Sequence, residues 1–416
     1  MMLSHKTAPF AAALMCLAAT RPMSATDEAL QKCLAQAAEQ ANFSGVMAAT
    51  ETGQAIALLA RGTLAGANSA AITAHTRFNL ASASKMFTAV AIGQLIDAGT
   101  VRLDDPIGAF VKDLEPETAA VTIRQLLTHS SGLGDFFKPE NMTAMLKART
   151  ASDLLPLVAH GKPTFTPGSH FAYSNSGFAL LGILIERVSG LRYGDYLARK
   201  IFAPAGMTET GLDPKPLATL AVGMTAMRMD RTPSGARGGS EPPVIRPDGT
   251  PTAGQRGADP AALSAGGRTE SVERPVLHPA PGATEGYGSA AGGLFSTAVD
   301  LQRFAEALLD HRLTSAVTTA ALTAPQILAV PATPSGPERR YGFGFGVGIE
   351  NGHQWFGHNG GTLGANAEFA VFPDNRLTLS VLSNRDPPMA TRMFAYLRKL
   401  ALDPSLRASC GTSEGK

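Results

Sequence analysis

The chain has 416 residues, of which 44% are hydrophobic and 17% charged, and its formal net charge is +2. These values are typical of a globular protein with a substantial core, and they exclude a disordered or collagen-like chain. The charge falls to 0 if a segment containing Lys6 and Arg21 is removed, so nothing suggests nucleic acid or an anionic membrane surface as a partner.

Residues 1–25 predict a signal peptide. Lys6 provides a positive start, "APFAAALMCLAA" an apolar core, and "MSA" a cleavage site after Ala25. The apolar run is shorter than the roughly 20 residues of a spanning helix, so we expect export with cleavage and not an uncleaved anchor. A lipoprotein signal fits less well because Met15, not a small residue, precedes Cys16. The mature chain is expected in the periplasm or secreted, with no membrane span.

The N-terminal third predicts a helix, a hairpin and a second helix. Residues 27–41 have helical periodicity, and two short apolar runs, "GVMAAT" and "QAIALLA", follow on either side of "ETG". A further helix begins at Ser82 and runs to about Ala98, where Gly99 ends it. Residues 104–226 are dominated by helical patterns interrupted by Pro and Gly.

Composition changes after Asp230. Residues 231–280 hold 8 Pro and 8 Gly, which predicts an irregular insertion or loop. A capped amphipathic helix follows in "GGLFSTAVDLQRFAEALL". Strands are then expected in "YGFGFGVGIE" and "HQWFGHNGG", a hairpin in "AEFAVFPDNRLTLSVLS", and a last helix in "MATRMFAYLRKLAL".

These elements predict an α/β (α+β) fold: a largely antiparallel sheet built from both chain ends, flanked by the N- and C-terminal helices, with an all-helical region inserted. We expect a signal peptide at 1–25, a sheet domain formed by 26–90 and 285–405, a helical domain at 91–227, a Pro/Gly-rich insertion or loop at 228–284, and a tail at 406–416.

Ser82 and Lys85 form an S-x-x-K pair ahead of the apolar run "MFTAVAIGQLI". A serine needs a base beside it to attack a carbonyl, and a lysine one helical turn later can reach its oxygen. The alternative is an ordinary helix start, with Ser82 as N-cap and Lys85 solvated. Spacing alone does not decide, because the tail "SEGK" repeats it at Ser413 and Lys416.

Two further motifs carry polar groups. Tyr173 and Asn175 form the only Y-x-N, in "FAYSNSGFALLG", although such residues also suit a turn. His358 and Gly360 form the only H-x-G, in "FGHNGGTLG", where Gly360 and Gly361 would let a substrate lie close to the strand. His358 titrates near neutral pH and could hold a positive charge, or it could be an unremarkable residue of a surface hairpin.

Together the three motifs resemble those of the serine penicillin-recognising hydrolases, which include class C β-lactamases, D-alanyl-D-alanine carboxypeptidases and related esterases. The motifs occur in the family's order, S-x-x-K, Y-x-N and K/H-x-G. Four longer segments are also similar: "TIRQLLTHSSGL", "YSNSGFALLGILIERVSG", "AAGGLFSTAVDLQRFAEALL" and "FAVFPDNRLTLSVLSN". The resemblance covers about residues 35–400, apart from 231–283.

The resemblance implies a serine hydrolase that cleaves an ester or amide through an acyl-enzyme on Ser82. Lys85 and Tyr173 would share the role of general base, which is left open between them. Asn175 would orient Lys85 and the substrate, and the backbone N–H groups of Ser82 and Gly361 would form the oxyanion hole. No metal or organic cofactor is implied, and the substrate would be a small molecule or a peptide.

The third motif departs from the β-lactamase form, which has Lys at the position of His358 and hydroxyl groups around it. Here Asn359 and Gly361 flank the site, and the nearest hydroxyl belongs to Thr362. We therefore expect a carboxypeptidase- or esterase-like enzyme, possibly acting on D-amino-acid peptides. The alternatives are a β-lactamase and a catalytically silent protein that binds penicillin or cell-wall peptides.

Two further expectations concern residues outside the motifs. His129, with Asp135 nearby, suggests a Ser-His-Asp arrangement, but the resemblance places this segment in the helical scaffold and favours a structural role. In the family's fold the first and last helices lie side by side, so a Cys33–Cys410 disulfide would join the chain ends. The oligomeric state and the natural substrate are left open.

Overall fold

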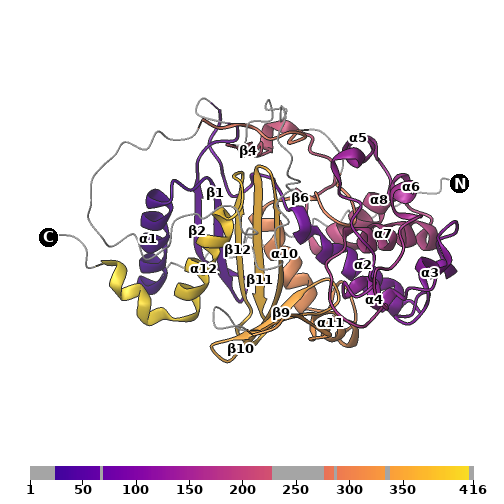
Figure 1. The fold of residues 1–416 in the computed structure, drawn as a ribbon. Coiled ribbons are helices and arrows are strands. Elements are labelled where there is room, and N and C mark those ends of the chain that lie inside the picture. The colour runs from indigo at the N-terminus through magenta and orange to yellow at the C-terminus, as the bar shows by residue number, and fades with distance from the viewer. Residues whose placement is uncertain (1–23, 66–68, 227–275, 285–287, 333–337, 412–416) are drawn as a thin grey trace, which may run out of the picture.

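An antiparallel sheet of eight strands lies at the centre of the molecule, in the order β2-β1-β12-β11-β10-β9-β8-β7 (Figure 1). The computed structural model describes residues 24–65, 69–226, 276–284, 288–332 and 338–411. The strands of this sheet are β1 Gly45–Glu51, β2 Gln54–Arg61, β7 Ile327–Val330, β8 Arg339–Tyr341, β9 Gly346–Glu350, β10 His353–Thr362, β11 Ala365–Phe372 and β12 Leu377–Ser383.

The expected hairpins are confirmed. The turn between β1 and β2 has Thr52 at φ 49° and Gly53 at φ 77°, and two positive φ values in succession fit the type I′ turn that the right-handed strand twist favours. A short 3-10 turn, Pro373–Asn375, joins β11 to β12, as "PDN" predicts. Both chain ends therefore contribute adjacent strands, because β1 pairs with β12.

Helices cover both faces of the sheet. Most of them lie on the side drawn to the right of the sheet in Figure 1. Their bounds are α1 Ala25–Gln40, α2 Lys85–Asp97, α3 Pro116–Ala119, α4 Ile123–Leu127, α5 Met142–Lys147, α6 Leu155–Val158, α7 Asn175–Ser189, α8 Tyr193–Leu197, α9 Ala203–Ala205, α10 Ala298–Leu309, α11 Ala316–Thr323 and α12 Met389–Leu402.

The first and last helices pack together on one face of the sheet, as expected. Leu30 and Leu34 of α1 join Phe394 and Leu397 of α12 in one buried cluster with side chains of β1, β11 and β12 (Figure 1). Strand β1 supplies both faces of the sheet: Met47 packs in this cluster, while its neighbours in sequence pack on the opposite side. Alternation along a strand explains why β1 is buried throughout.

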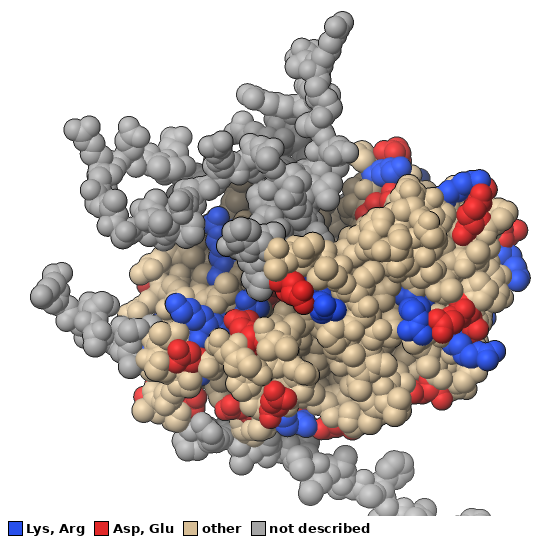
Figure 2. Space-filling model, turned by 60° about the horizontal axis from the view of Figure 1, so that its bottom comes forward, with Lys and Arg blue, Asp and Glu red and all other residues tan. Residues whose placement is uncertain are grey.

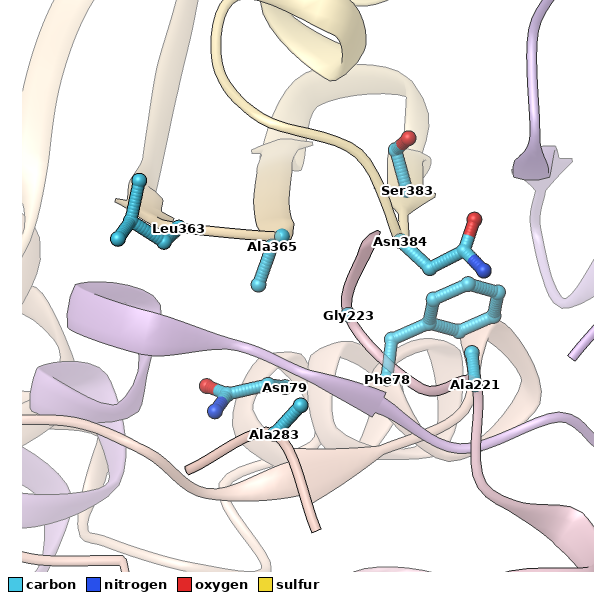
Figure 3. Close-up of a pocket in the computed structure, with 10 residues that line it drawn as sticks. Phe78, Asn79, Ala221, Gly223, Ala283, Leu363, Ala365, Ser383 and Asn384 are labelled. Carbon is cyan, nitrogen blue, oxygen red and sulfur yellow. The ribbon is translucent and has the colours of Figure 1, made fainter. Parts of the chain in front are cut away.

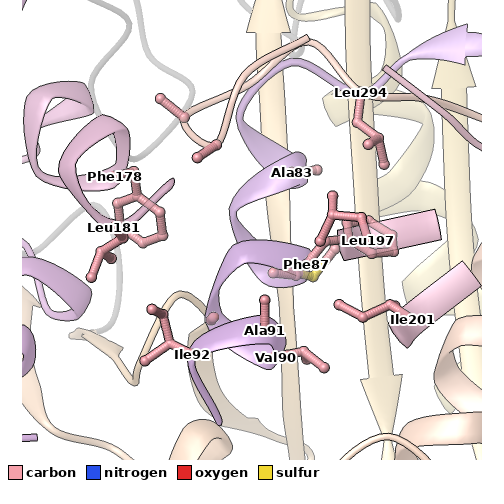
Figure 4. Close-up of a cluster of buried hydrophobic side chains, with 14 of the residues drawn as sticks. Ala83, Phe87, Val90, Ala91, Ile92, Phe178, Leu181, Leu197, Ile201 and Leu294 are labelled. Carbon is pink, nitrogen blue, oxygen red and sulfur yellow. The ribbon is translucent and has the colours of Figure 1, made fainter. Parts of the chain in front are cut away.

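The opposite face packs against the larger core, in which α2 is central. Figure 4 shows Phe87 and Val90 of α2 among side chains from α7 and from the segment Leu197–Ile201. Ten of the thirteen residues of α2 are buried, including its first residue, Lys85. A helix buried nearly all round is held by packing, so its position relative to the sheet is fixed.

Every element that the structure describes from Lys85 to Thr219 is a helix or a helical turn. This agrees with a helical region inserted between sheet segments. Short strand pairs lie beyond it: β3 (Phe78–Asn79) with β6 (Phe295–Ser296), and β4 (Met224–Thr225) with β5 (His278–Pro279). The β4–β5 pair shows that the ends of the expected insertion are joined. Most of that insertion and residues 1–23 of the expected signal peptide lie outside the described residues, and the domain limits remain predictions.

The surface carries both signs of charge. Figure 2 shows Lys and Arg side chains interspersed with Asp and Glu on the visible face. This mixture agrees with the near-neutral composition and gives no large field of one sign on that face. Within the described ranges no helix combines the length and the apolar character that crossing a membrane requires.

Candidate active site

Ser82 lies in a 3-10 turn, η1 (Ala81–Ser84), that leads into α2. Ala81 has φ 44°, a left-handed conformation that costs a non-glycine residue about 1–2 kcal/mol. The Ser84 hydroxyl holds this turn by donating to the Ala81 carbonyl at 2.7 Å. Ser82 is partly exposed while its neighbours in the turn are buried, and the N-cap position of α2 belongs to Ser84. Ser82 is therefore not the N-cap of α2.

Lys85 is fully buried and directs its amine at three oxygens. Nζ lies 3.3 Å from Ser82 Oγ, 2.7 Å from Asn175 Oδ1 and 2.5 Å from the Ala291 carbonyl. The same nitrogen lies 4.8 Å from the centre of the Tyr173 ring. The alternative of a solvated Lys85 is therefore wrong.

Burial lowers the pKa of Lys85 to about 7, and the Asp135 carboxylate offsets only part of this effect. A substantial fraction of the amine is thus neutral at neutral pH. A neutral amine has two N–H groups and one lone pair. The Asn175 side-chain oxygen and the Ala291 carbonyl can only accept, so they take the two N–H groups and the lone pair faces Ser82 Oγ.

Asp135 fixes the orientation of Asn175. The Asn175 amide nitrogen donates to Asp135 Oδ2 at 2.7 Å, so its oxygen must face Lys85. The second Asp135 oxygen accepts from the Phe137 backbone N–H at 2.9 Å, and the carboxylate is partly exposed. Sequence reasoning did not assign Asp135 to this site, because its link to Asn175 spans 40 residues and follows from no motif.

Tyr173 presents its hydroxyl next to Ser82. The Tyr173 hydroxyl oxygen is buried and has no partner at hydrogen-bonding geometry among the described residues. Burial raises the pKa of Tyr173 well above its usual value, and the nearby Ser82 hydroxyl lowers that pKa by less. The phenol therefore keeps its proton at neutral pH and is suited to donate a hydrogen bond.

His129 packs behind Tyr173 and does not approach Ser82 as a base. Its ring stacks on Tyr173 with centroids 4.1 Å apart, and its Nδ1 accepts from the Ser174 backbone N–H at 3.1 Å. Burial lowers its pKa well below the usual value. The geometry agrees with the expected structural role and offers no Ser-His-Asp arrangement, since Asp135 binds Asn175 instead.

The third motif lies on β10, directly against η1. A methyl group added at Gly360 would come within 2.0 Å of the Leu80 carbonyl oxygen and 2.9 Å of the Ser82 backbone nitrogen. Only a glycine permits this approach. Strand β9 pairs with β10 no further than Gly357, so beyond that residue β11 is the only strand among the described residues that pairs with β10. Gly361 therefore lies on a stretch of β10 that is unpaired on its other side and next to Ser82.

The surroundings of His358 favour a neutral ring over the charged alternative. The side chain is 7% exposed, and its Nε2 lies 2.9 Å from the Tyr341 hydroxyl while Nδ1 lies 2.5 Å from the Asn359 carbonyl. Burial, followed by the nearby Lys85 charge, lowers the pKa of His358 to about 3. The ring is neutral: Nδ1–H donates to the Asn359 carbonyl, and Nε2 accepts from Tyr341.

Two cavities lie near these elements, but no candidate catalytic side chain lines either one. The smaller, of about 20 Å³, lies at the end of the β10–β11 hairpin between Asn79, Leu363 and Asn384 (Figure 3). This volume holds about one water molecule and no substrate. The larger, of about 300 Å³, lies beside α4, between Arg124 and Gln326. In the described part of the chain no cluster of three or more His, Cys, Asp or Glu could hold a metal ion.

Cys33 is disulfide-bonded. Its sulfur lies 3.8 Å from the Arg407 carbonyl oxygen, in the 3-10 segment Pro404–Gly411 that packs on α1. Arg407 precedes Cys410 by three residues, although the Cys410 side chain lies outside the described part of the chain. The environment of Cys33 is therefore compatible with the expected partner, and the pairing itself remains a prediction.

Curated relatives of this chain include penicillin-binding proteins and D-aminopeptidases. Penicillin-binding protein 4* of Bacillus subtilis is 32% identical over 186 residues, which are 44% of this chain and 40% of that protein. D-aminopeptidase of Brucella canis is 33% identical over 176 residues, which are 41% of this chain and 33% of that protein. The chain thus aligns with less than half the length of either relative.

A solved structure and a family model agree with the relationship to these relatives. The crystal structure of a penicillin binding protein from Bacillus halodurans superimposes with a TM-score of 0.69 and 26% identity, covering 88% of this chain and 98% of that one. A family model described as Beta-lactamase matches residues 30–402. This chain belongs to the Beta-lactamase family, whose serine hydrolases it resembles in motif and fold.

Proposed function

We propose that this serine hydrolase cleaves amides through an acyl-enzyme on Ser82, and that it favours substrates with a free amine next to the scissile carbonyl. The observation that carries the catalytic part is the Lys85 amine, buried and 3.3 Å from Ser82 Oγ. Because its pKa is lowered to about 7, this amine can accept the Ser82 proton at neutral pH.

In the acylation step Ser82 Oγ bonds to the carbonyl carbon of the amide while its proton passes to Lys85. The carbonyl oxygen becomes an oxyanion, and the backbone N–H groups of Ser82 and Gly361 are its proposed donors. The C–N bond then breaks as the Tyr173 phenol gives its proton to the leaving nitrogen. The Lys85 ammonium restores the Tyr173 proton, so neither side chain changes state overall.

Deacylation repeats the step with water. A water molecule loses a proton to Lys85 and its oxygen bonds to the ester carbon, after which the Ser82–acyl bond breaks and Ser82 regains a proton. The net change is amide plus water giving a carboxylic acid and an amine. Apart from the substrate and water, these proposed steps use residues of this chain.

Asp135 supports the substrate class. Its carboxylate is next to Asn175 in the hydrogen-bond chain from Ser82 through Lys85, and it is partly exposed. Each Asp135 oxygen already accepts one hydrogen bond and keeps capacity for another, so a substrate ammonium group has an acceptor close to the nucleophile. The D-aminopeptidase relatives are consistent with a free amine on the substrate.

Neutral His358 argues against a β-lactamase. A substrate carboxylate needs a cation or several donors, and both His358 nitrogens are already bound to Tyr341 and the Asn359 carbonyl. Amides without a carboxylate at that end fit the site better. Export is part of the proposal, supported by the N-terminal signal pattern and by the disulfide at Cys33, since disulfides persist in oxidising compartments.

The test compares the p-nitroanilides of D-alanine, L-alanine and N-acetyl-D-alanine, with p-nitrophenyl acetate as an ester lacking an amine. We expect kcat/KM for the free-amine D-anilide to exceed that for the N-acetyl form at least tenfold. Asp135→Asn should bring the two values together, whereas its effect through Asn175 and Lys85 should lower turnover of both anilides and of the ester by the same factor. Equal turnover of both anilides would overturn the amine preference, and covalent labelling by penicillin without any turnover would indicate a silent binding protein.

A further inference from the structure

Behind the proposed oxyanion hole, Asn366 of β11 binds the backbone of β10. Asn366 is 3% exposed, and its amide nitrogen donates to the Gly360 carbonyl at 3.0 Å. Its oxygen accepts from the Thr391 backbone N–H at 3.2 Å, at the start of α12. These two contacts fix which end of the amide faces Gly360, because Thr391 N–H can only donate.

The carbonyl that Asn366 binds belongs to the peptide that ends in the Gly361 N–H. In a trans peptide the C=O and N–H groups point in opposite directions. A donor on the Gly360 carbonyl therefore draws electron density from the peptide and makes the Gly361 N–H a stronger donor. On this geometry a hydrogen bond behind β10 strengthens a donor on the Ser82 side.

This peptide is restrained on its β11 side by the β10–β11 ladder, in which Gly360 pairs with Ala367 and Gly361 with Asn366. It lies between Gly360 and Gly361, and glycine restricts neither neighbouring backbone angle. A side chain at position 360 cannot add a further restraint, because Gly360 lies too close to Leu80 and Ser82 for a Cβ atom. Strand β9 does not supply it either, because β9 pairs with β10 no further than Gly357. Asn366 therefore adds a side-chain contact to this peptide, which neither a side chain at Gly360 nor strand β9 restrains.

Thr391 holds Asn366 in place from α12. Its hydroxyl donates to Glu368 Oε1 at 2.7 Å. Its backbone N–H separately donates to the Asn366 oxygen at 3.2 Å. Glu368 and Asn366 are two residues apart on β11 and so face α12 together. The same helix that packs the sheet against α1 thereby positions a polar group behind the catalytic strand.

We propose that Asn366 is a positioning residue of the oxyanion hole, orienting and polarising the Gly360–Gly361 peptide for the transition state. This proposal rests on the proposed function, because it takes the Gly361 N–H as an oxyanion donor. Loss of the contact should lower kcat and leave KM nearly unchanged, because the oxyanion forms only in the transition state. If Asn366 were only structural, its loss would lower stability without lowering kcat selectively at nearly unchanged KM.

The test uses Asn366→Leu, which keeps the volume and removes the donor. Asn384→Leu is the matched control: Asn384 is 2% exposed, and its amide nitrogen likewise binds backbone carbonyls, but those of Thr63 and Val222 and not that of Gly360. We expect about a tenfold or greater loss of kcat for Asn366→Leu and little change in kcat for the control. If the leucine variant does not fold, Asn366→Ser is measured instead with the same expectation.

A second readout separates this proposal from the proposed function. The rate at which a fluorophosphonate labels Ser82 depends on the oxyanion donors but not on amide turnover. If no amide is hydrolysed but labelling slows about tenfold in Asn366→Leu, the proposed function fails and the role of Asn366 stands. Unchanged kcat and labelling, or a loss that the control shares equally, would overturn the proposal.

Discussion

The Lys85 amine lies 3.3 Å from the Ser82 hydroxyl, and its other two neighbours can only accept hydrogen bonds. This relationship favours Lys85 over Tyr173 as the proposed base. Burial lowers the pKa of Lys85 to about 7 and raises the pKa of Tyr173. In the proposed mechanism lysine therefore takes the proton and tyrosine returns one.

The first prediction concerns the pH dependence of the rate. The base must be neutral, so kcat/KM should fall below the Lys85 pKa of about 7, tenfold for each further pH unit, and reach a plateau above it. Lys85→Arg, which cannot lose its proton, should be inactive at all these pH values. A rate that is flat from pH 5 to 8 would contradict the role of Lys85.

Stability should follow the same group with a defined sign. The folded-state pKa of Lys85 is lowered to about 7 from 10.5, so the unfolded chain binds more protons between these values. Unfolding free energy contributed by Lys85 therefore rises with pH from about 7 to 10.5, by at most about 1.4 kcal/mol per pH unit. Urea unfolding of the wild type and of Lys85→Met should show a difference that shifts in favour of the wild type over this range. Parallel curves would count against burial of the amine.

Gly360→Ala should separate β10 from η1. The added methyl group would lie 2.0 Å from the Leu80 carbonyl oxygen, so the strand must move away from Ser82. A displacement of about 1 Å can cost roughly 100-fold in rate, and we expect a loss of that order in kcat/KM. Gly211→Ala is the control, because no atom lies within 4 Å of its added Cβ. Wild-type activity of the Gly360 variant would show that the contact is not needed.

His358→Gln should leave the shape of the pH profile unchanged between pH 5 and 8. The ring is already neutral there, since burial lowers its pKa to about 3. The expected effect is on stability, a loss of about 1 kcal/mol from the altered contact with the Tyr341 hydroxyl, measured by thermal or urea unfolding. A new titration near neutral pH in the wild type that vanishes in the variant would restore the idea of a charged His358.

The disulfide prediction needs only mass mapping. Digestion without reduction should give one linked peptide pair containing Cys33 and Cys410, since the Cys33 sulfur lies near Arg407. Cys33→Ser should then cost about 2–5 kcal/mol of unfolding free energy. Recovery of Cys410 as a free thiol would exclude this pairing.

Much of this molecule follows from its sequence. The sheet hairpins, the helices at both chain ends and the meeting of Ser82, Lys85, Tyr173 and Asn175 are predicted from periodicity and from three short motifs. Apolar residues recur with a period of 2 in strands and 3.6 in helices because these positions lie on the buried face of the element. A motif match adds the long-range contacts that periodicity cannot give.

The remainder depends on contacts between distant segments. Asp135 and Asn366 act through Asn175 and Gly360, and no spacing in the sequence marks either link. The charge of His358 could not be decided from the sequence, because its pKa depends on burial and on Lys85, neither of which its own motif specifies. The 3-10 geometry at Ser82 likewise replaces an expected helix start, because Ala81 adopts a positive φ.

The most direct measurement is the site and pH dependence of covalent labelling by a fluorophosphonate, followed by peptide mass spectrometry. We expect a single adduct on Ser82, a labelling rate that rises through pH 7, and no adduct in Ser82→Ala. An adduct on another residue, or a wild-type rate independent of pH from 5 to 8, would contradict the assignment of Ser82 as a nucleophile activated by Lys85.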